Sequence, residues 1–583
     1  MKFCKLFLFL TIFSLLTSLD GKAQAYMKAQ GQQILDKDGK PFIIRSMGIG
    51  GWMLQEGYHM NTSGAADTQH ELEERIVSLT SKDFKDEFYD LWLANFFNKR
   101  DLDSLKSWGF NTIRPALHYK WFTPPIEEEK NPEVITWRNK GFALLDSLIQ
   151  WCSANKMYLI LDLHAAPGGQ GYNASISDYD TTKPSLWESE ANRNKTVALW
   201  KKIADHCKNE PWIGGYDLIN ETNWTFEGNF DGGIAKNGCQ DTANIPLKNL
   251  LKRITGAIRE VDTNHMIILE GNCWANNYRG LTPPWDDNLV YSFHKYWNEN
   301  NQAAIQEFLD LREKYDIPIW LGETGENSNT WFTDCVSLME EHQIGWSWWT
   351  HKQLNDIDDP LIILQNKYYK KTLAYWKGNG PKPTREETEK AFLQLAEDAK
   401  LENCTYHKDV IDALFRRTNT TESIPFKEHQ IPGRIKAADY DLGHLHHAWY
   451  DSVYQNLDMN TTPNLGHSCR NDGVDIGRDE KSGELFVGWI ESGEWLQYTI
   501  DVPEPGKYIF SFKTTTDKES GALQILVNQD EKVKKLKLEK SKTVNDPVIT
   551  SSEGIELEKG YQQIKILFRE GGFRFYSFDL KKL

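Results

Sequence analysis

The chain has 583 residues and a formal net charge of −16, with 40% hydrophobic and 12% aromatic residues. This length and apolar content predict at least two domains. The negative charge argues against a nucleic-acid-binding protein, because phosphate binding needs a basic face and the sequence has no long Lys/Arg run. Its 22 Trp residues are more informative, since exposed flat aromatic side chains stack on sugar rings, although most Trp in any protein lies in the core.

Residues 1–25 have the pattern of a cleavable secretory signal. Lys2 and Lys5 precede an apolar run from Leu6 to Leu16, and the segment ends on Ala-Gln-Ala at 23–25. A membrane anchor is the alternative, but the apolar run is short for a bilayer crossing. We therefore expect the mature chain to be secreted, periplasmic or on the cell surface, without a membrane span.

The eight cysteines fit that compartment. Cys4 is removed with the signal, and the other seven are scattered without the close pairs typical of metal sites. They allow some disulfides but no dense framework. An oxidising, extracytoplasmic compartment is expected.

From residue 42 to about residue 400, within a first domain assigned to residues 26–425, short apolar runs rich in β-branched and aromatic residues alternate with amphipathic helical patterns. Helices are predicted over 138–156, 246–262 and 385–400, the last of them starting with acidic residues. Eight alternating units predict an α/β fold, a (β/α)8 TIM barrel with its active site at the carboxyl ends of the strands. The predicted strands are 42–49, 110–117, 157–165, 212–220, 265–272, 289–296, 317–325 and 344–352.

Residues 426–583 differ in composition from the barrel. The helical period disappears, and runs such as "KYIFSFKTTT" and "YQQIKILFRE" predict strands joined by Gly, Pro, Asn and Asp turns. About 150 residues are enough for two packed sheets, so we predict an all-β sandwich.

Polar residues stand where each barrel strand is expected to end. For any single strand this could be the ordinary transition into a loop, but convergence from all eight strands indicates a functional site. The residues are Trp52 and Glu56, Arg114, His164, Asn220 with Glu221, Glu270, His294 with Tyr296, Glu323, and Trp349 with Lys352.

Two of these carboxylates suggest the chemistry. Glu221 follows the fourth strand and Glu323 ends the seventh, so they should face each other across the barrel mouth. Glycosidic bond cleavage needs one protonated carboxyl group and one ionised carboxylate across a cleft. Arg114 and His294 could make the two carboxyl groups differ. A cation beside Glu323 would lower its pKa and keep it ionised, while the pKa of Glu221, next to Asn220, stays higher. A structural ion-pair network is the alternative.

Several strand-end motifs resemble, in order and position, those of glycoside hydrolase family 5. They are "NTIRPALHYKW", "LILDLHAAPGGQ", "YDLINETNW", "YSFHKYW", "IWLGETG" and "GWSWWTHK", and the match covers about residues 30–360. "SMGIGGWMLQE" and "DLHAAPGGQ" look most like the fungal-type exo-β-1,3-glucanases of that family.

The resemblance implies a retaining hydrolase in which Glu221 is the acid/base and Glu323 the nucleophile. By the same resemblance Asn220 would hold the sugar 2-hydroxyl and Arg114 would support the nucleophile. His164, His294 and Tyr296 would complete the subsite at the cleaved bond, with Trp349 as its stacking floor. No metal or other cofactor is implied.

Two other classes of protein remain as alternatives. A metal-dependent hydrolase could use His118, His164, His294 and Asp162, but no two of these have a short ligand spacing. A non-catalytic glycan-binding protein on a barrel scaffold would be expected to lack one of the two carboxylates.

The second domain resembles family 6 carbohydrate-binding modules, which are jelly-roll sandwiches. The resemblance rests on "IPGRIKAADYD", "NDGVDIG", "VGWIESGEWLQYTIDVPEPGKY" and "GGFRFYSFDL". Lys436, Ala437 and Ala438 replace the acidic residues with which that family binds calcium, so we expect no such ion. Trp489 and Trp495 are expected in the core, which leaves Trp449, Tyr450 and Phe486 as candidates for a sugar platform.

The sequence therefore predicts a secreted β-glucan hydrolase, acting as a monomer on β-1,3 or β-1,4 linkages. A β-mannanase or β-1,6-glucanase of the same family is the alternative. The loops from residue 172 and from residue 222 shape the outer subsites, but their sequences do not identify the linkage or distinguish endo from exo action.

Overall fold

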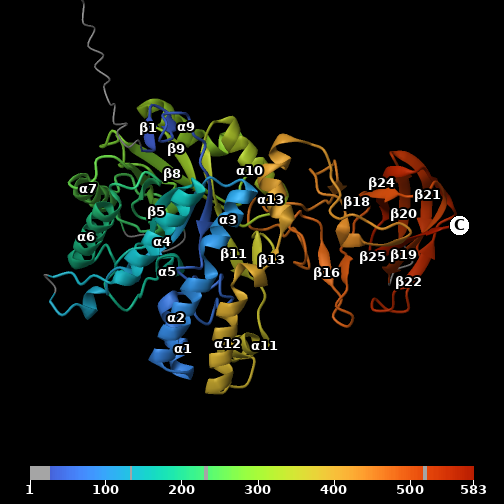
Figure 1. The fold of residues 1–583 in the computed structure, drawn as a ribbon, viewed down its shortest axis with the longest axis horizontal. Coiled ribbons are helices and arrows are strands. Elements are labelled where there is room, and N and C mark those ends of the chain that lie inside the picture. The colour runs from blue at the N-terminus through green and yellow to red at the C-terminus, as the bar shows by residue number, and fades with distance from the viewer. Residues whose placement is uncertain (1–25, 132–133, 229–233, 517–520) are drawn as a thin grey trace, which may run out of the picture.

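The computed structural model describes residues 26–131, 134–228, 234–516 and 521–583. The predicted signal segment, residues 1–25, lies outside these ranges. Within them, no helix combines the length and the apolar character that a bilayer crossing requires. A barrel surrounded by helices lies beside a β-sandwich (Figure 1).

Eight parallel strands close into a barrel in the order β10-β3-β4-β5-β6-β7-β8-β9. Each overlaps a run that the sequence pattern predicts as a strand, so the predicted fold class is confirmed. The strands are almost fully buried because side chains fill the barrel and helices cover it. Their bounds are β3 (Arg45–Ile49), β4 (Thr112–His118), β5 (Tyr158–Ala165), β6 (Ile213–Asp217), β7 (Met266–Glu270), β8 (Leu289–Lys295), β9 (Ile319–Gly325) and β10 (Gly345–Trp349).

Helices pack around the barrel with one apolar face inward. In α7 (Ile245–Arg259), for example, Leu247, Leu251 and Ile254 recur at helical spacing and are buried. The other barrel helices are α3 (Lys99–Trp108), α4 (Asn139–Asn155), α6 (Glu190–Cys207), α9 (Gln306–Tyr315), α10 (Asn329–Glu341) and α13 (Lys408–Phe415).

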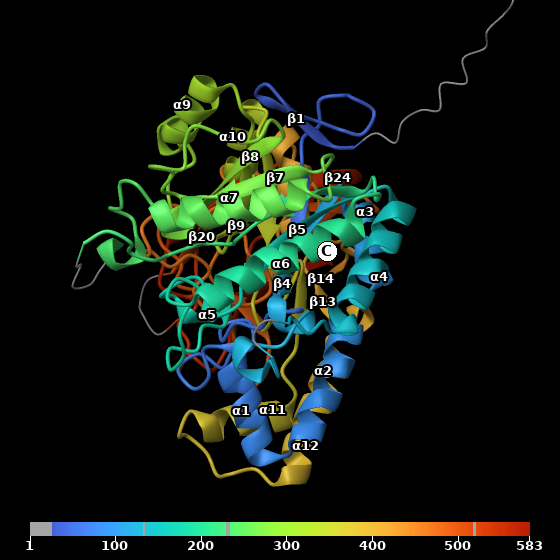
Figure 2. The ribbon, with the colours of Figure 1, turned by 90° about the vertical axis from the view of Figure 1, so that its left-hand side faces the viewer.

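The prediction that the helix from residue 385 is the last one was wrong. α12 (Arg385–Asp398) is followed by α13, whose Phe415 contacts Trp346 on β10 and Phe110 before β4. α13 therefore covers the barrel after its eighth strand. α12 instead packs with α1 (Gln69–Leu79), α2 (Lys82–Phe96) and α11 (Lys367–Trp376) in a group of helices that projects from the barrel (Figure 2).

The amino-terminal end of the barrel is closed. The hairpin of β1 (Lys28–Gln30) and β2 (Gln33–Leu35) lies there, and Met27 packs into an apolar cluster with Ile44 and Ile160. Only the carboxyl ends of the strands are left to form a site, as expected for this fold.

The second domain is a sandwich of two antiparallel sheets with its own apolar core between them. One sheet contains β14 (Gly433–Lys436), β16 (Ile476–Arg478), β17 (Leu485–Val487), β19 (Gly506–Thr515), β22 (Val548–Ser551), β23 (Ile555–Leu557) and β25 (Arg574–Lys582). The other contains β15 (Trp449–Tyr450), β18 (Trp495–Val502), β20 (Ala522–Val527), β21 (Asp530–Lys537) and β24 (Gly560–Glu570).

A buried ion-pair network joins the barrel to the sandwich. Asp472 of the sandwich contacts Arg417 after α13 at 2.6 Å and Arg470 at 2.6 Å, and all three side chains are almost fully buried. Although burial opposes ionisation, Arg417 and Arg470 lower the pKa of Asp472. The carboxylate therefore stays charged between two guanidinium groups.

Replacing Asp472 by Ala should destabilise the protein by about 3–5 kcal/mol. The buried Arg470 would lose the carboxylate that it contacts, and Arg417 would keep only Asp412. The midpoint of urea unfolding of the full chain, followed by tryptophan fluorescence, measures this loss. Asp579→Ala is the matched control, because Asp579 pairs with the largely exposed Arg434 and should lose less than about 1 kcal/mol. Equal losses in the two variants would contradict the role of the buried network.

Candidate active site

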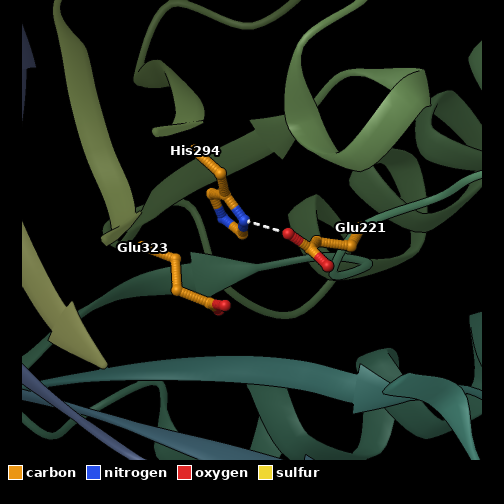
Figure 3. A group of neighbouring side chains, drawn as sticks. All are labelled: Glu221, His294 and Glu323. Carbon is orange, nitrogen blue, oxygen red and sulfur yellow. Dashed lines mark hydrogen bonds and ion pairs between the residues drawn. The ribbon is translucent and has the colours of Figure 1, made fainter. Parts of the chain in front are cut away.

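A cavity of about 1010 Å³ opens at the carboxyl ends of the barrel strands. Its walls come from the loops after β3, β5, β6, β7, β8, β9 and β10, so most of the barrel rim contributes. Glu221, His294 and Glu323 lie together at its floor (Figure 3).

The two carboxylates predicted to form a pair are close together. One oxygen of Glu221, one of Glu323 and a ring nitrogen of His294 all lie within 4.8 Å of one another. The backbone of Glu221 has φ of +39°, in the left-handed region that residues other than glycine rarely adopt. Such strain at a cavity floor is typical of a functional position.

Arg114 holds the base of the site. Its guanidinium donates to Glu323 Oε2 at 2.8 Å, to Glu270 Oε1 at 2.8 Å and to Asp217 Oδ2 at 3.0 Å. It also donates to Asn220 Oδ1 at 2.8 Å. Although burial opposes its charge, the surrounding carboxylates hold the pKa of Arg114 well above its ordinary value. The guanidinium therefore orients Glu323 and places a fixed positive charge beside it, as the sequence predicted.

Glu221 has a different environment from Glu323. Burial raises the pKa of Glu221, while a 2.6 Å hydrogen bond between its Oε1 and His294 Nδ1 acts in the opposite direction. The backbone N–H of Glu221 donates to Glu270 Oε2 at 2.6 Å. Glu270 thus contacts both Glu221 and Arg114. Because Arg114 also contacts Glu323, Glu270 connects Glu221 to Glu323.

Replacing His294 by Gln should move the alkaline limb of the kcat/KM pH profile to higher pH. His294 lowers the pKa of Glu221, so its removal raises that pKa, and Glu221 stays protonated to higher pH. We expect kcat/KM at the optimum to fall about tenfold or more, because Glu221 loses an orienting contact. Tyr296→Phe is the control, since Tyr296 contacts Glu323 and not Glu221. An alkaline limb that stays in place in His294→Gln contradicts the coupling.

Four other predicted residues lie close to the pair. The Tyr296 hydroxyl donates to Glu323 Oε1 at 2.9 Å. The rings of His164 and Trp349 lie parallel, 5.0 Å apart, and both line the cavity. Asn220 precedes Glu221 in the chain, and its Nδ2 lies 3.2 Å from His164 Nε2. The structure therefore brings these four residues together with the carboxylates.

Trp52 was wrongly predicted to bind substrate. It is 1% exposed in the barrel core, where its indole N–H donates to the Leu93 carbonyl on α2. The chain turns after β3 through Gly51, which has φ of +74°, and the Trp52 side chain then packs against Phe97. Glu56, by contrast, lines the cavity, and burial raises its pKa to about 8.

Sequence reasoning missed four polar side chains that line the cavity near Glu56. They follow β3, β9 and β10, and they are Tyr58, Glu326, Asp356 and Asp358. Burial raises the pKa of Glu326 to about 8, and Trp349 Nε1 donates to the Tyr58 hydroxyl at 2.6 Å. The signal that could have found Tyr58 and Glu326 is their closeness in sequence to Glu56 and Glu323.

Glu221, His294 and Glu323 are close enough together to contact one metal ion. Their hydrogen bonds argue against that role, because His294 Nδ1 already contacts Glu221 and both oxygens of Glu323 accept bonds from Arg114 and Tyr296. A guanidinium 2.8 Å from the carboxylate would also repel a cation. His118, a member of the alternative metal set, contacts Asp178 instead.

A disulfide fixes the rim beside Glu221. Cys239, in the loop after β6, is bonded to Cys273, in the loop after β7. Cys273 is followed by Trp274, which lines the cavity. The disulfide thus ties together two loops on the Glu221 side of the site.

The sugar-platform assignment in the sandwich needs correction. Trp449 and Phe486 are buried, at 0% and 4% exposure. Trp449 packs in the core between the sheets, whereas Phe486 is covered by Trp489, Tyr576 and Arg574. Trp489, predicted to be in the core, is 51% exposed and lies in a turn with φ of +49°. Trp495 is buried as predicted, beneath Lys565, and Tyr450 is half-buried.

A closed (β/α)8 barrel whose mouth holds two neighbouring carboxylates in one cavity fits an O-glycosyl hydrolase. Residues 71–355 match the family described as cellulase (glycosyl hydrolase family 5), and residues 467–582 match carbohydrate binding module (family 6). The barrel belongs to glycosyl hydrolase family 5, and the chain is a glycosidase that also carries a family 6 module.

Curated relatives include a "Beta-xylosidase" of Phanerodontia chrysosporium, 27% identical over 57% of this chain and 71% of the relative. "Endoglucanase C" of Acetivibrio thermocellus is 23% identical over 47% of this chain and 88% of the relative. A solved structure of a β-glucanase from Saccharophagus degradans is 17% identical, covers 64% of this chain and 95% of its own, and superposes with a TM-score of 0.37.

Proposed function

We propose that this chain is a secreted, retaining β-glycoside hydrolase that acts on β-glucan, with Glu323 as the nucleophile and Glu221 as the acid/base. The separation of the carboxylates supports this assignment most strongly. One oxygen of Glu221 and one of Glu323 lie within 4.8 Å of each other, which is closer to the 5–5.5 Å or so between the carboxyl groups of retaining enzymes than to the roughly 6.5–9.5 Å of inverting ones.

In the first step, Glu323 attacks the anomeric carbon while Glu221 donates its proton to the glycosidic oxygen, and the bond to the leaving group breaks. In the second step, Glu221 takes a proton from water, which attacks the same carbon and releases Glu323. Arg114 and Tyr296 hold Glu323 in place for the attack. The raised pKa of Glu221 suits the acid role in the first step.

The stereochemistry of the product tests the retaining mechanism. Proton NMR during hydrolysis of a β-glycoside should detect the β-anomer first, with the α-anomer appearing later by mutarotation. The α-anomer as first product would overturn the proposed double displacement. A purified chain that binds β-glucan but hydrolyses no β-glycoside would instead be a non-catalytic glycan-binding protein.

The β-glucan assignment rests on the resemblance to family members and on the relatives' names. These include endoglucanases and, at 25% and 24% identity, a probable glucan 1,3-β-glucosidase and a probable glucan endo-1,6-β-glucosidase. The products from a panel of β-1,3-, β-1,4- and β-1,6-gluco-oligosaccharides and manno-oligosaccharides would identify the linkage. Faster hydrolysis of the manno-oligosaccharides than of every gluco-oligosaccharide would reject β-glucan.

Secretion is proposed from the signal pattern of residues 1–25, and the Cys239–Cys273 bond is consistent with an oxidising compartment. Expression of the full chain followed by amino-terminal sequencing of extracytoplasmic material should find a start near Tyr26. A chain that keeps residues 1–25 and stays inside the cell would contradict secretion.

A further inference from the structure

The barrel topology determines which end of the cavity receives each half of the substrate. In the closed strand order, β6 stands opposite β10. Glu221 follows β6 and, in the proposed function on which this inference rests, protonates the oxygen of the leaving group. The leaving group therefore lies over the β6 rim, and the glycone, the half that bonds to Glu323, extends over the opposite rim of β10 and its neighbours β9 and β3.

A segment of the sandwich reaches that opposite rim. Residues 451–473 form most of the connection from β15 to β16, and we name them the docking segment. Met459, within it, lines the cavity together with Glu326 after β9 and Asp356 after β10. His467 Nε2, also in the docking segment, lies 3.1 Å from Asp356 Oδ1. The glycone end of the site is thus built from both domains, between which the docking segment lies (Figure 1).

The docking segment is fixed to the barrel by reciprocal hydrogen bonds to the start of α10. Asn327 Nδ2 donates to the Asn456 carbonyl at 2.6 Å, and the Asn456 N–H donates back to Asn327 Oδ1 at 2.9 Å. Asn471 Nδ2 donates to the Asn327 carbonyl at 2.7 Å, and the Asn329 N–H donates to the Asn471 carbonyl at 2.7 Å. Buried polar groups satisfied in this way are costly to separate.

Apolar contact and charge reinforce these hydrogen bonds. Leu457 packs against the apolar core of the barrel, while Tyr454 in the same segment packs against the core of the sandwich. Asp472 lies in the buried network with Arg417 described above. The docking segment is therefore a rigid bridge between two cores, unlike a flexible linker to a remote module.

We propose that the docking segment is the wall that ends the substrate cleft at its glycone end. Met459 is the specificity-determining residue of this wall, because it is the side chain of the docking segment that lines the cavity in the described chain. The wall limits how many sugar units fit between the cleaved bond and the non-reducing end. The module thereby contributes to the choice of substrate at the catalytic site itself.

A glycone-length series tests this proposal on the full chain. The substrates are 4-nitrophenyl β-glycosides with one to four glucose units, joined by the linkage that the wild type hydrolyses. With the wild type, kcat/KM should rise over the first units and then level off at the wall. The measured ratio is kcat/KM for the four-unit substrate divided by kcat/KM for the one-unit substrate. Met459→Gly should raise this ratio about fivefold, because opening the wall adds one subsite that contributes about 1 kcal/mol of binding. Met459→Trp should lower the ratio.

The control separates the wall from glycan binding elsewhere on the module. Trp489→Ala removes an exposed aromatic side chain of the sandwich that is remote from Met459 in sequence, and it should leave the ratio unchanged. Met459 is 69% exposed, so its replacement should not impair folding. Unchanged ratios in both Met459 variants, or an equal change in Trp489→Ala, would overturn the wall while the proposed function stands. A wild type inactive on every glycoside would overturn the proposed function and the wall with it.

Discussion

Replacing Glu323 by Gln is expected to lower kcat roughly 10⁴-fold or more on every β-glycoside that the wild type hydrolyses. The amide keeps the shape of the side chain and can still contact Arg114 and Tyr296, but it cannot form the glycosyl ester. Initial rates with a 4-nitrophenyl β-glycoside measure the loss. A 2-deoxy-2-fluoro glycoside with a good leaving group should label the wild type on the peptide that contains Glu323 and leave the variant unlabelled.

Glu326→Gln is the matched control for this substitution. Glu326 lines the same cavity three residues further on, and burial raises its pKa to about 8. The carboxyl group of Glu326 is largely protonated at neutral pH, so replacing it by a neutral amide hardly changes the charge of the cavity. Activity should therefore fall less than about tenfold. Comparable losses in both variants, or a label on another peptide, would contradict the role of Glu323.

The fold was readable from the sequence because barrel strands are buried on both sides. Apolar runs such as residues 157–165 and 317–325 have a composition that few other elements share, and their alternation with amphipathic helices leaves few topologies. The carboxyl ends of the strands then define the site, which is why Glu221 and Glu323 could be paired although 102 residues separate them. The structure brings them within 4.8 Å.

The errors occurred where a single turn decides the direction of a side chain. Trp52 stands three residues after β3, and the turn through Gly51 directs it into the core instead of the cavity. Trp489 alternates with polar neighbours like a strand residue, yet its positive φ belongs to a turn that exposes it. Local pattern does not determine turn geometry to within one residue.

The docking segment could not be predicted at all. Residues 451–473 carry neither a helical nor a strand period, and their position depends on contacts with loops more than a hundred residues away, such as the bonds between Asn327 and Asn456. Single-sequence patterns contain no information on such pairs. For the same reason the acidic residues at the glycone end, among them Asp356 and Asp358, had no visible connection to the site.

Replacing Glu221 by Ala should affect substrates according to their leaving group. For an unactivated β-glycoside, kcat/KM should fall about 10²–10⁴-fold, because the leaving oxygen loses its proton donor. For a 2,4-dinitrophenyl β-glycoside it should stay within about tenfold of the wild type, since that leaving group departs without a proton. The variant should then accumulate the glycosyl ester on Glu323, because water lacks its base. Steady-state rates and mass spectrometry of the intact protein measure both effects.

Azide distinguishes the two carboxylates from each other. In Glu221→Ala it can enter the space left by the side chain and attack the glycosyl ester without general base assistance, so it should restore turnover and yield the β-glycosyl azide. If Glu221 were the nucleophile instead, azide would displace the leaving group directly and yield the α-glycosyl azide. The anomeric configuration of the azide product therefore assigns the roles of Glu221 and Glu323 independently of any rate, and an α-product would exchange them.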